Sequence, residues 1–288
     1  MNLWKETESP SSADDNQSGV SRRSFFKRAA LVGATAAVAG SGLTTAASAL
    51  ENTTRISRPE DVVKGLTSGD RAIFVAAQIA EALAVTTYSN IIETAPFFKR
   101  IPTDDQGYLT GALQEEMSHY LLEQDAIDEF VPFTNFYYPV DMFLSAQVTL
   151  NTLVTLEDAF IAAYLVGVRN FSTSALRVTA ARIMGIESDH RTLARVVGPD
   201  VAKQDGGPIN FITGAQGVSE SCAPPNNNGY ERTLCWSKIS QAVDALLPFV
   251  SIEAAQTAGF DTSRSYPFEP FNPTLPNPLG DFFSFSGC

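Results

Sequence analysis

Glu116-Met117-Ser118-His119 is followed later in the chain by a stretch of the same spacing, Glu187-Ser188-Asp189-His190. The 288-residue sequence contains two histidines, and each lies three residues after a glutamate. Residues i and i+3 of an α-helix share a face, so each pair can direct a carboxylate and an imidazole at one point. Carboxylate oxygens and imidazole nitrogens together are a metal-ligand set. The two stretches therefore predict two helices that contribute to one metal site.

Four long segments with helical hydrophobic periodicity occupy the middle of the chain. We expect the first helix to begin near Thr67, where Thr67 and Asp70 resemble a capping box, and to stop before Pro96. The other predicted helices span 103–130, 141–170 and 173–197, and Gly198-Pro199 is the predicted stop of the last one. A fifth, amphipathic helix is predicted over 236–251, followed by an extended, Pro-rich tail. The fold class expected is all-α.

Single glutamates interrupt the apolar stripes of the first and third helices. If the first helix pairs antiparallel with the second, and the third with the fourth, these two glutamates and those of the two Glu-x-x-His stretches lie about 20 Å from the connected ends of each pair, at the same level of the core. The predicted ligands are Glu81, Glu116, His119, Glu157, Glu187 and His190. This set suits two metal ions, with two terminal glutamates, two bridging glutamates and one histidine for each ion. The alternative is a bundle without metal, but buried carboxylates without a partner cost several kcal/mol or more.

Four further residues near these positions have two interpretations each. Glu115 is either a solvated charge or a hydrogen-bond partner for a histidine. Glu123, one turn after His119, is either a helix-face charge or an extra ligand on an access path. Tyr88 and Tyr164 each lie seven residues after a glutamate, and core packing is the favoured reading over a redox role or contact with the ligands.

The ligand order resembles that of the ferritin-like superfamily of di-iron carboxylate proteins over about residues 67–198, and it is similar to bacterioferritins and rubrerythrins. The resemblance implies a ferritin-like four-helix bundle with a long crossover between its second and third helices. It also implies two Fe ions as cofactor, with Mn as the alternative. The long loop and Pro-rich tail are more similar to the branch that includes desiccation-related proteins. The chain has no CxxC, so the rubredoxin module of rubrerythrins is absent.

The N-terminal segment resembles a twin-arginine export signal. Ser21-Arg22-Arg23-Ser24-Phe25-Phe26-Lys27 is followed by an Ala- and Gly-rich run and by Ala47-Ser48-Ala49, a typical cleavage site. The alternative is a basic, flexible arm. We expect a signal peptide at 1–49, a lead-in at 50–66, the bundle at 67–198, and a loop, extra helix and tail packed on the bundle at 199–288. The predicted location is the periplasm or the extracellular space.

Composition excludes several classes of partner. The net charge of −12 and pI near 4.6 argue against nucleic acid and anionic membrane surfaces, which both require a basic face. After signal cleavage no membrane span is expected. The pairing of Cys222, Cys235 and Cys288 is left open, with a loop disulfide between the first two as one arrangement. Homo-oligomerisation is also left open.

Two classes of function fit these features. The first is an exported di-metal protein that oxidises Fe(II) or reduces O₂ or peroxide in stress protection, as a ferroxidase, a peroxidase or a di-manganese catalase. Its partners are metal ions and O₂ or peroxide. The second is a non-enzymatic desiccation or envelope stress protein whose metal site is structural or vestigial. Turnover by the metal-loaded protein separates the two classes.

Overall fold

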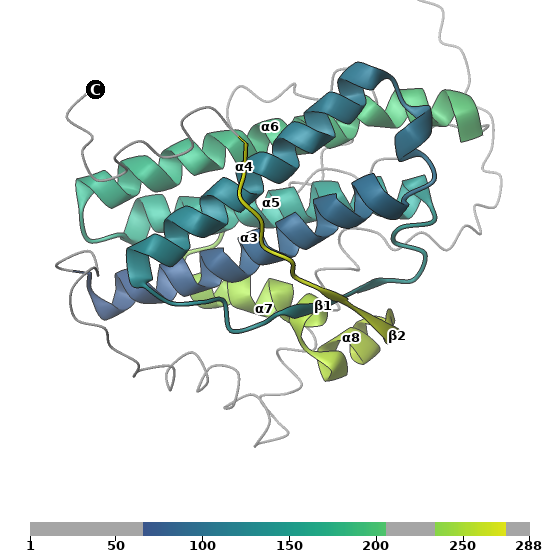
Figure 1. Ribbon diagram of the computed structural model, residues 1–288. Coiled ribbons are helices and arrows are strands. Elements are labelled where there is room, and N and C mark those ends of the chain that lie inside the picture. The colour runs from purple at the N-terminus through teal and green to yellow at the C-terminus, as the bar shows by residue number, and fades with distance from the viewer. Residues whose placement is uncertain (1–65, 206–233, 275–288) are drawn as a thin grey trace, which may run out of the picture.

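The computed structural model describes residues 66–205 and 234–274. The predicted signal peptide, the predicted lead-in up to residue 65 and loop residues 206–233 lie outside the described residues. The helices α3 (Ser68–Thr94), α4 (Thr103–Ile127), α5 (Ala146–Asn170) and α6 (Ser174–Asp205) lie side by side as a bundle (Figure 1). The predicted all-α class and its four-helix bundle are therefore confirmed.

The connections between the helices determine the direction of each one. A short connection with the 3₁₀ turn η1 (Phe98–Arg100) links α3 to α4, and residues 171–173 link α5 to α6. By contrast, residues 128–145 run along the length of the bundle before α5 begins (Figure 1). Helices α4 and α5 therefore run in the same direction. This is the long crossover that the family resemblance implied, and helix periodicity alone could not distinguish it from a hairpin.

Several helix ends differ from those predicted. Helix α5 begins at Ala146 rather than at residue 141, because Asp141 adopts a left-handed conformation (φ 63°) and the Ser145 side chain caps the helix. Helix α4 ends at Ile127 because Asp128 adopts a left-handed conformation (φ 51°) that ends the helical hydrogen bonding. Helix α6 continues through Gly198-Pro199 to Asp205, so the predicted stop is wrong. A helical proline removes one hydrogen bond, but Val197 and Val201 on either side are each 1% exposed. Their burial outweighs the local signal to stop.

The C-terminal part packs on the crossover as well as on the bundle. Helix α7 (Ile239–Val250) is the predicted fifth helix, and the short α8 (Ile252–Ala258) follows it. Strand β2 (Phe260–Pro267) then pairs antiparallel with β1 (Asn135–Pro139) of the crossover, a pairing that the sequence did not predict. The Tyr138 ring lies 5.9 Å from Phe249, which in turn lies 5.0 Å from Phe260. Aromatic packing thus connects crossover, α7 and tail.

After β2 the tail crosses α4, as Figure 1 shows. The Phe268 ring lies 4.7 Å from the ring of Tyr120, and the Thr274 amide donates a 2.8 Å hydrogen bond to Gln114. These two α4 residues flank Glu116 and His119 in the sequence. The extended tail therefore covers the outside of α4 at the level of the predicted metal site. Within the described part of the chain Cys235 is exposed and has no disulfide partner, whereas Cys222 and Cys288 lie outside the described residues.

Helices α3 and α5 are the most apolar elements of the bundle. Both are long and apolar enough to cross a membrane, but 89% and 78% of their most apolar windows are buried inside the protein. Core helices of a bundle have this composition because other helices surround them. The absence of a membrane span after signal cleavage stays a prediction.

Asp70 joins the start of α3 to the α5–α6 connection. Its carboxylate accepts hydrogen bonds from the Ser172 amide (2.8 Å) and hydroxyl (2.6 Å), and from the Thr67 amide (2.9 Å) and hydroxyl (2.8 Å). Burial raises the pKa of Asp70, but these hydrogen bonds outweigh burial and hold the pKa below its ordinary value of 3.8. The ionised form therefore stabilises the fold.

We predict that Asp70→Ala lowers the free energy of unfolding at pH 7 by about 2–3 kcal/mol, because several charge-assisted hydrogen bonds and a helix cap are lost. Since the folded pKa is depressed, the contribution is present above pH 3.8 and disappears as the pH falls through the folded value. Denaturant unfolding at pH 7 and pH 3 measures both effects. Asp104→Ala, at an exposed position of the first turn of α4, is the control and should change stability by less than about 0.5 kcal/mol.

Candidate metal centre

The structure brings all six predicted ligands together in the middle of the bundle. Helix α3 supplies one of them, α4 supplies two, α5 supplies one and α6 supplies two. They are, in chain order, Glu81, Glu116, His119, Glu157, Glu187 and His190. Four of the six are 0% exposed, and the most exposed, His119, is 7% exposed. Each of the four helices thus directs its candidate ligands into the core at the same level.

The ligand atoms form two groups that share two carboxylates. One group consists of Glu81, Glu116, His119 and Glu187, and the other of Glu116, Glu157, Glu187 and His190, each with ligand atoms within 4.8 Å of one another. Because Glu116 and Glu187 belong to both groups, they are the residues that would bridge two bound ions. The remaining glutamate and histidine of each group would be terminal ligands of one ion each. This is the arrangement that a two-metal site requires.

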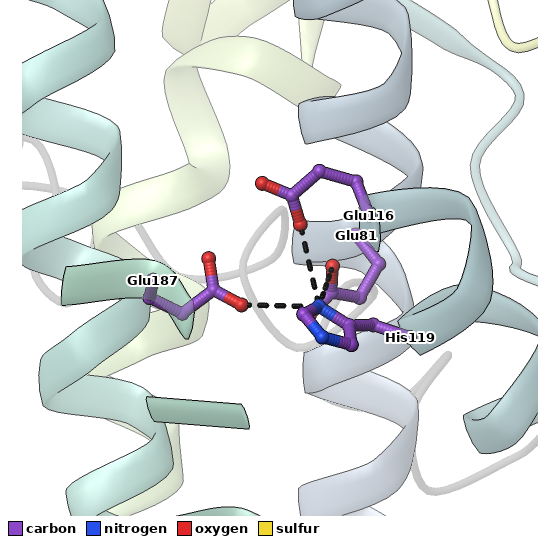
Figure 2. Close-up of side chains that lie close together, drawn as sticks. All are labelled: Glu81, Glu116, His119 and Glu187. Atoms are coloured by element: carbon purple, nitrogen blue, oxygen red, sulfur yellow. Dashed lines mark ion pairs between the residues drawn. The ribbon is translucent and has the colours of Figure 1, made fainter. Parts of the chain in front are cut away.

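Figure 2 shows the first group: Glu187 extends from the opposite side toward the His119 ring, while Glu81 and Glu116 approach from its own side. The His119 Nδ1 atom lies 3.2 Å from Glu187 Oε1 and 3.6 Å from an oxygen of both Glu81 and Glu116. One imidazole nitrogen therefore faces three carboxylates from three helices.

In the second group, the histidine lies closer to its nearest carboxylate than His119 does in the first. His190 Nδ1 lies 2.9 Å from Glu116 Oε1 and 3.6 Å from Glu187 Oε2. Its other nitrogen, Nε2, lies 2.8 Å from Glu115 Oε2. Of the two interpretations of Glu115, the structure supports the histidine partner, since a carboxylate on the outer nitrogen orients the ring.

The hydroxyls of Tyr88 and Tyr164 contact candidate glutamate ligands, whereas the sequence favoured core packing for both tyrosines. The Tyr88 hydroxyl donates to Glu157 Oε1 at 2.7 Å. The Tyr164 hydroxyl donates to Glu123 Oε1 at 2.7 Å and also contacts Glu81 Oε1. The tyrosine of each first helix thus contacts the terminal glutamate of the other half. The seven-residue spacing was the available signal, because it places tyrosine and glutamate on one face two turns apart.

A buried ion pair beside the site was not predicted. Arg191 Nη1 lies 2.7 Å from Asp158 Oδ1, and both side chains are buried. Asp158 follows Glu157 in the chain, and Arg191 follows His190. The pair therefore joins α5 to α6 directly beside two of the candidate ligands. A charged residue next to each ligand was the only sequence signal, and it carries little information because such residues are usually solvated.

The electrostatics of the cluster reflect the crowding of carboxylates. Burial, and then the Glu116 and Glu187 carboxylates, raise the pKa of Glu81 and Glu157 well above the usual range. Burial also raises the pKa of Glu116, but the nearby His190 and His119 imidazoles outweigh it and lower that pKa. Burial lowers the pKa of both imidazoles, yet the facing carboxylates outweigh burial and raise it well above the usual value. Without metal, the imidazoles thus supply the positive charge.

Several buried carboxylate oxygens in the described part of the chain have no hydrogen-bond partner. They include Oε2 of Glu81, Glu116 and Glu157 and both oxygens of Glu187. A buried acceptor without a partner is costly, and more so when it is charged. Divalent cations placed within the two groups would satisfy these oxygens together. Four carboxylates and two imidazoles suit Fe or Mn, so the residues present fit the metals that the sequence predicted.

A comparison with known protein families identifies the segment of the chain that forms the bundle. Residues 69–198 match the family model described as ferritin-like domain. The matched segment contains nearly all of α3, all of α4 and α5, most of α6 and every one of the six candidate ligands. Searches of curated proteins and of solved structures give no match.

We predict opposite effects of Glu157→Gln on the metal-free and the metal-loaded protein. Burial favours the uncharged carboxyl at this position, and glutamine mimics that form while accepting the Tyr88 hydrogen bond. The metal-free variant should therefore be more stable than wild type by about 1–2 kcal/mol. The increase in melting temperature on adding Mn²⁺ should fall below half that of wild type. Glu93→Gln, at an exposed position of α3, should leave both quantities unchanged in the same thermal unfolding assay.

Proposed function

The chain belongs to the ferritin-like superfamily through residues 69–198, and from this membership we propose that it binds two iron ions and oxidises Fe(II) with O₂ or peroxide. The single observation that carries the proposal is the pair of ligand groups that share Glu116 and Glu187. Shared carboxylates hold two ions close together, at about 3.5–4 Å in two-metal sites generally. A pair of metal ions at that spacing supplies two electrons together when both are oxidised.

The four glutamates of the site and the two tyrosines would have different roles in this chemistry. Glu116 and Glu187 would bridge the two ions and hold their spacing. Glu81 and Glu157 would be the terminal carboxylates, and the hydroxyls of Tyr164 and Tyr88 contact them. Each of these two glutamates keeps one oxygen without a hydrogen bond, and that oxygen would be available to a bound ion.

The surroundings of the site support chemistry that excludes bulk water. All six candidate ligands are at most 7% exposed, and the tail between Phe268 and Thr274 covers α4 beside them. Small, uncharged molecules such as O₂ and peroxide suit a buried site of this kind better than large organic substrates. Mn is the alternative metal, since the same oxygen and nitrogen ligands suit it.

We further propose that the protein acts outside the cytoplasm. The support is the order of twin arginines, apolar run and cleavage site within residues 1–49, which lie outside the described residues. Proteins exported by the twin-arginine route fold before export, so the metals could be loaded in the cytoplasm.

Elemental analysis tests the metal site directly. We expect about two metal ions per chain in the purified wild-type protein, and fewer than 0.5 in His119→Ala/His190→Ala, because each variant residue removes one ligand of a different ion. A matched control is Thr110→Ala, an exposed position of α4. Fewer than about one ion per chain in wild type, after reconstitution with Fe(II) under anaerobic conditions, would contradict the six-ligand site.

Turnover distinguishes the enzyme from a structural metal protein. The iron-loaded wild-type protein should consume O₂ or peroxide in proportion to added Fe(II), and the double histidine variant should consume either at least tenfold more slowly. An oxygen electrode and a peroxide assay measure this. If the loaded protein consumes neither, while removal of the metal lowers its melting temperature, the metals are structural and the enzymatic proposal fails.

A further inference from the structure

The two halves of the bundle repeat each other, which makes their differences informative. Glu81 and Tyr88 on α3 correspond to Glu157 and Tyr164 on α5, with the same seven-residue spacing. The Glu-x-x-His stretch of α4 corresponds in the same way to that of α6. Two of the positions at which the halves differ carry a glutamate in one half and an apolar residue in the other. These two differences make the proposed metal positions inequivalent.

The first difference concerns the outer nitrogen of each histidine. Glu115, directly before Glu116, lies 2.8 Å from Nε2 of His190. The corresponding residue of the other half is the apolar Ile186, so it cannot offer the same contact to His119. His190 is accordingly fully buried with both nitrogens in contact with carboxylates, whereas His119 is 7% exposed and its nearest carboxylate oxygen lies at 3.2 Å. The Glu157–His190 half is therefore the better organised before metal binds.

The second difference is an additional buried carboxylate. Glu123 lies on α4 one turn after His119, and its counterpart on α6 is Ala194. Glu123 is 1% exposed, and its Oε2 has no hydrogen-bond partner. Its Oε1 shares the hydroxyl of Tyr164 with Glu81. That hydroxyl has one hydrogen and cannot donate to both carboxylates at once.

An extra carboxylate whose one hydrogen bond is shared and whose second oxygen has none is costly in a helical core. Burial raises the pKa of Glu123 well above its usual range, although the Tyr164 hydrogen bond and the His119 charge oppose the effect. A hydrophobic residue at this position would be the stable choice, as Ala194 is in the other half. Glu123 lies outside the two groups of ligand atoms, but it shares the Tyr164 hydroxyl with Glu81, so a divalent cation at the Glu81–His119 position would attract its free oxygen as a further ligand.

We propose that Glu123 is an additional carboxylate ligand of the Glu81–His119 position, and that this position binds its ion second and exchanges it, while the Glu157–His190 position binds first and retains its ion. The inference rests on the proposed two-metal site. The two features that distinguish the halves have opposite consequences. Glu115 orients His190 for tight binding, whereas Glu123 gives the looser and more exposed half a further oxygen with which to take up a cation.

Calorimetric titration of the metal-free, full-length protein with Co²⁺ tests this order. Wild type should bind two equivalents in a tight and a weaker step; His190→Ala should remove the tight step and His119→Ala the weaker one. Glu123→Gln should weaken the second step at least tenfold and change the first less than twofold. The matched variant Glu115→Gln should do the reverse. Tyr164→Phe, which keeps Glu123 but removes the shared hydroxyl, should retain the second step within about threefold.

The outcomes separate this inference from the proposed function. If wild type binds two ions but Glu123→Gln leaves both steps unchanged or weakens both equally, the role of Glu123 is refuted and the two-metal site stands. If wild type binds fewer than one ion, the proposed function fails as well. Circular dichroism of the metal-free variants checks folding. Should Glu123→Gln not fold, Glu123→Asp replaces it, and unaltered binding by that shortened side chain would refute direct coordination.

Discussion

The burial of five glutamate side chains at one level of a helical core is the constraint on which this structure depends. Glu81, Glu116, Glu123, Glu157 and Glu187 are each at most 1% exposed. Carboxylates in such a setting raise one another's pKa and oppose the packing of the helices that carry them. The surrounding residues can be understood as responses to this charge: two imidazoles within the cluster and two tyrosine hydroxyls at its edges. Even so, several carboxylate oxygens have no hydrogen-bond partner among the described residues.

At the level of the buried glutamates, the stability of the metal-free fold and the proposed metal binding have opposite requirements. An apolar core of the same shape would be more stable without metal, because it would bury no charge. Bound cations would compensate the carboxylates, and the same groups that destabilise the metal-free bundle would then stabilise it. In the metal-free protein, contacts outside the cluster of glutamates hold the helices together. Asp70 joins α3 to the α5–α6 connection, and the Asp158–Arg191 pair joins α5 to α6 beside the ligands.

The crossover and the tail enclose the bundle from outside. Because α4 and α5 are joined along the length of the bundle, strand β1 is placed where β2 of the tail can pair with it. The tail then continues across α4 beside the candidate ligands. Bundle and C-terminal segment are thus connected through the crossover, and the candidate site lies beneath that segment.

The sequence by itself predicted the all-α bundle and the level of the core at which the six candidate ligands meet; their assignment as ligands stays a prediction. Helical periodicity and the Glu-x-x-His spacing are local properties, so they can be read from neighbouring residues. Tertiary structure alone decided the contacts that join distant segments. Whether Tyr164 packs or contacts Glu81 and Glu123 depends on three helices at once. The continuation of α6 past Gly198-Pro199 depends on the burial of Val197 and Val201, which no local signal contains. The β1–β2 pairing likewise joins residues more than 120 positions apart, because only the folded crossover brings them together.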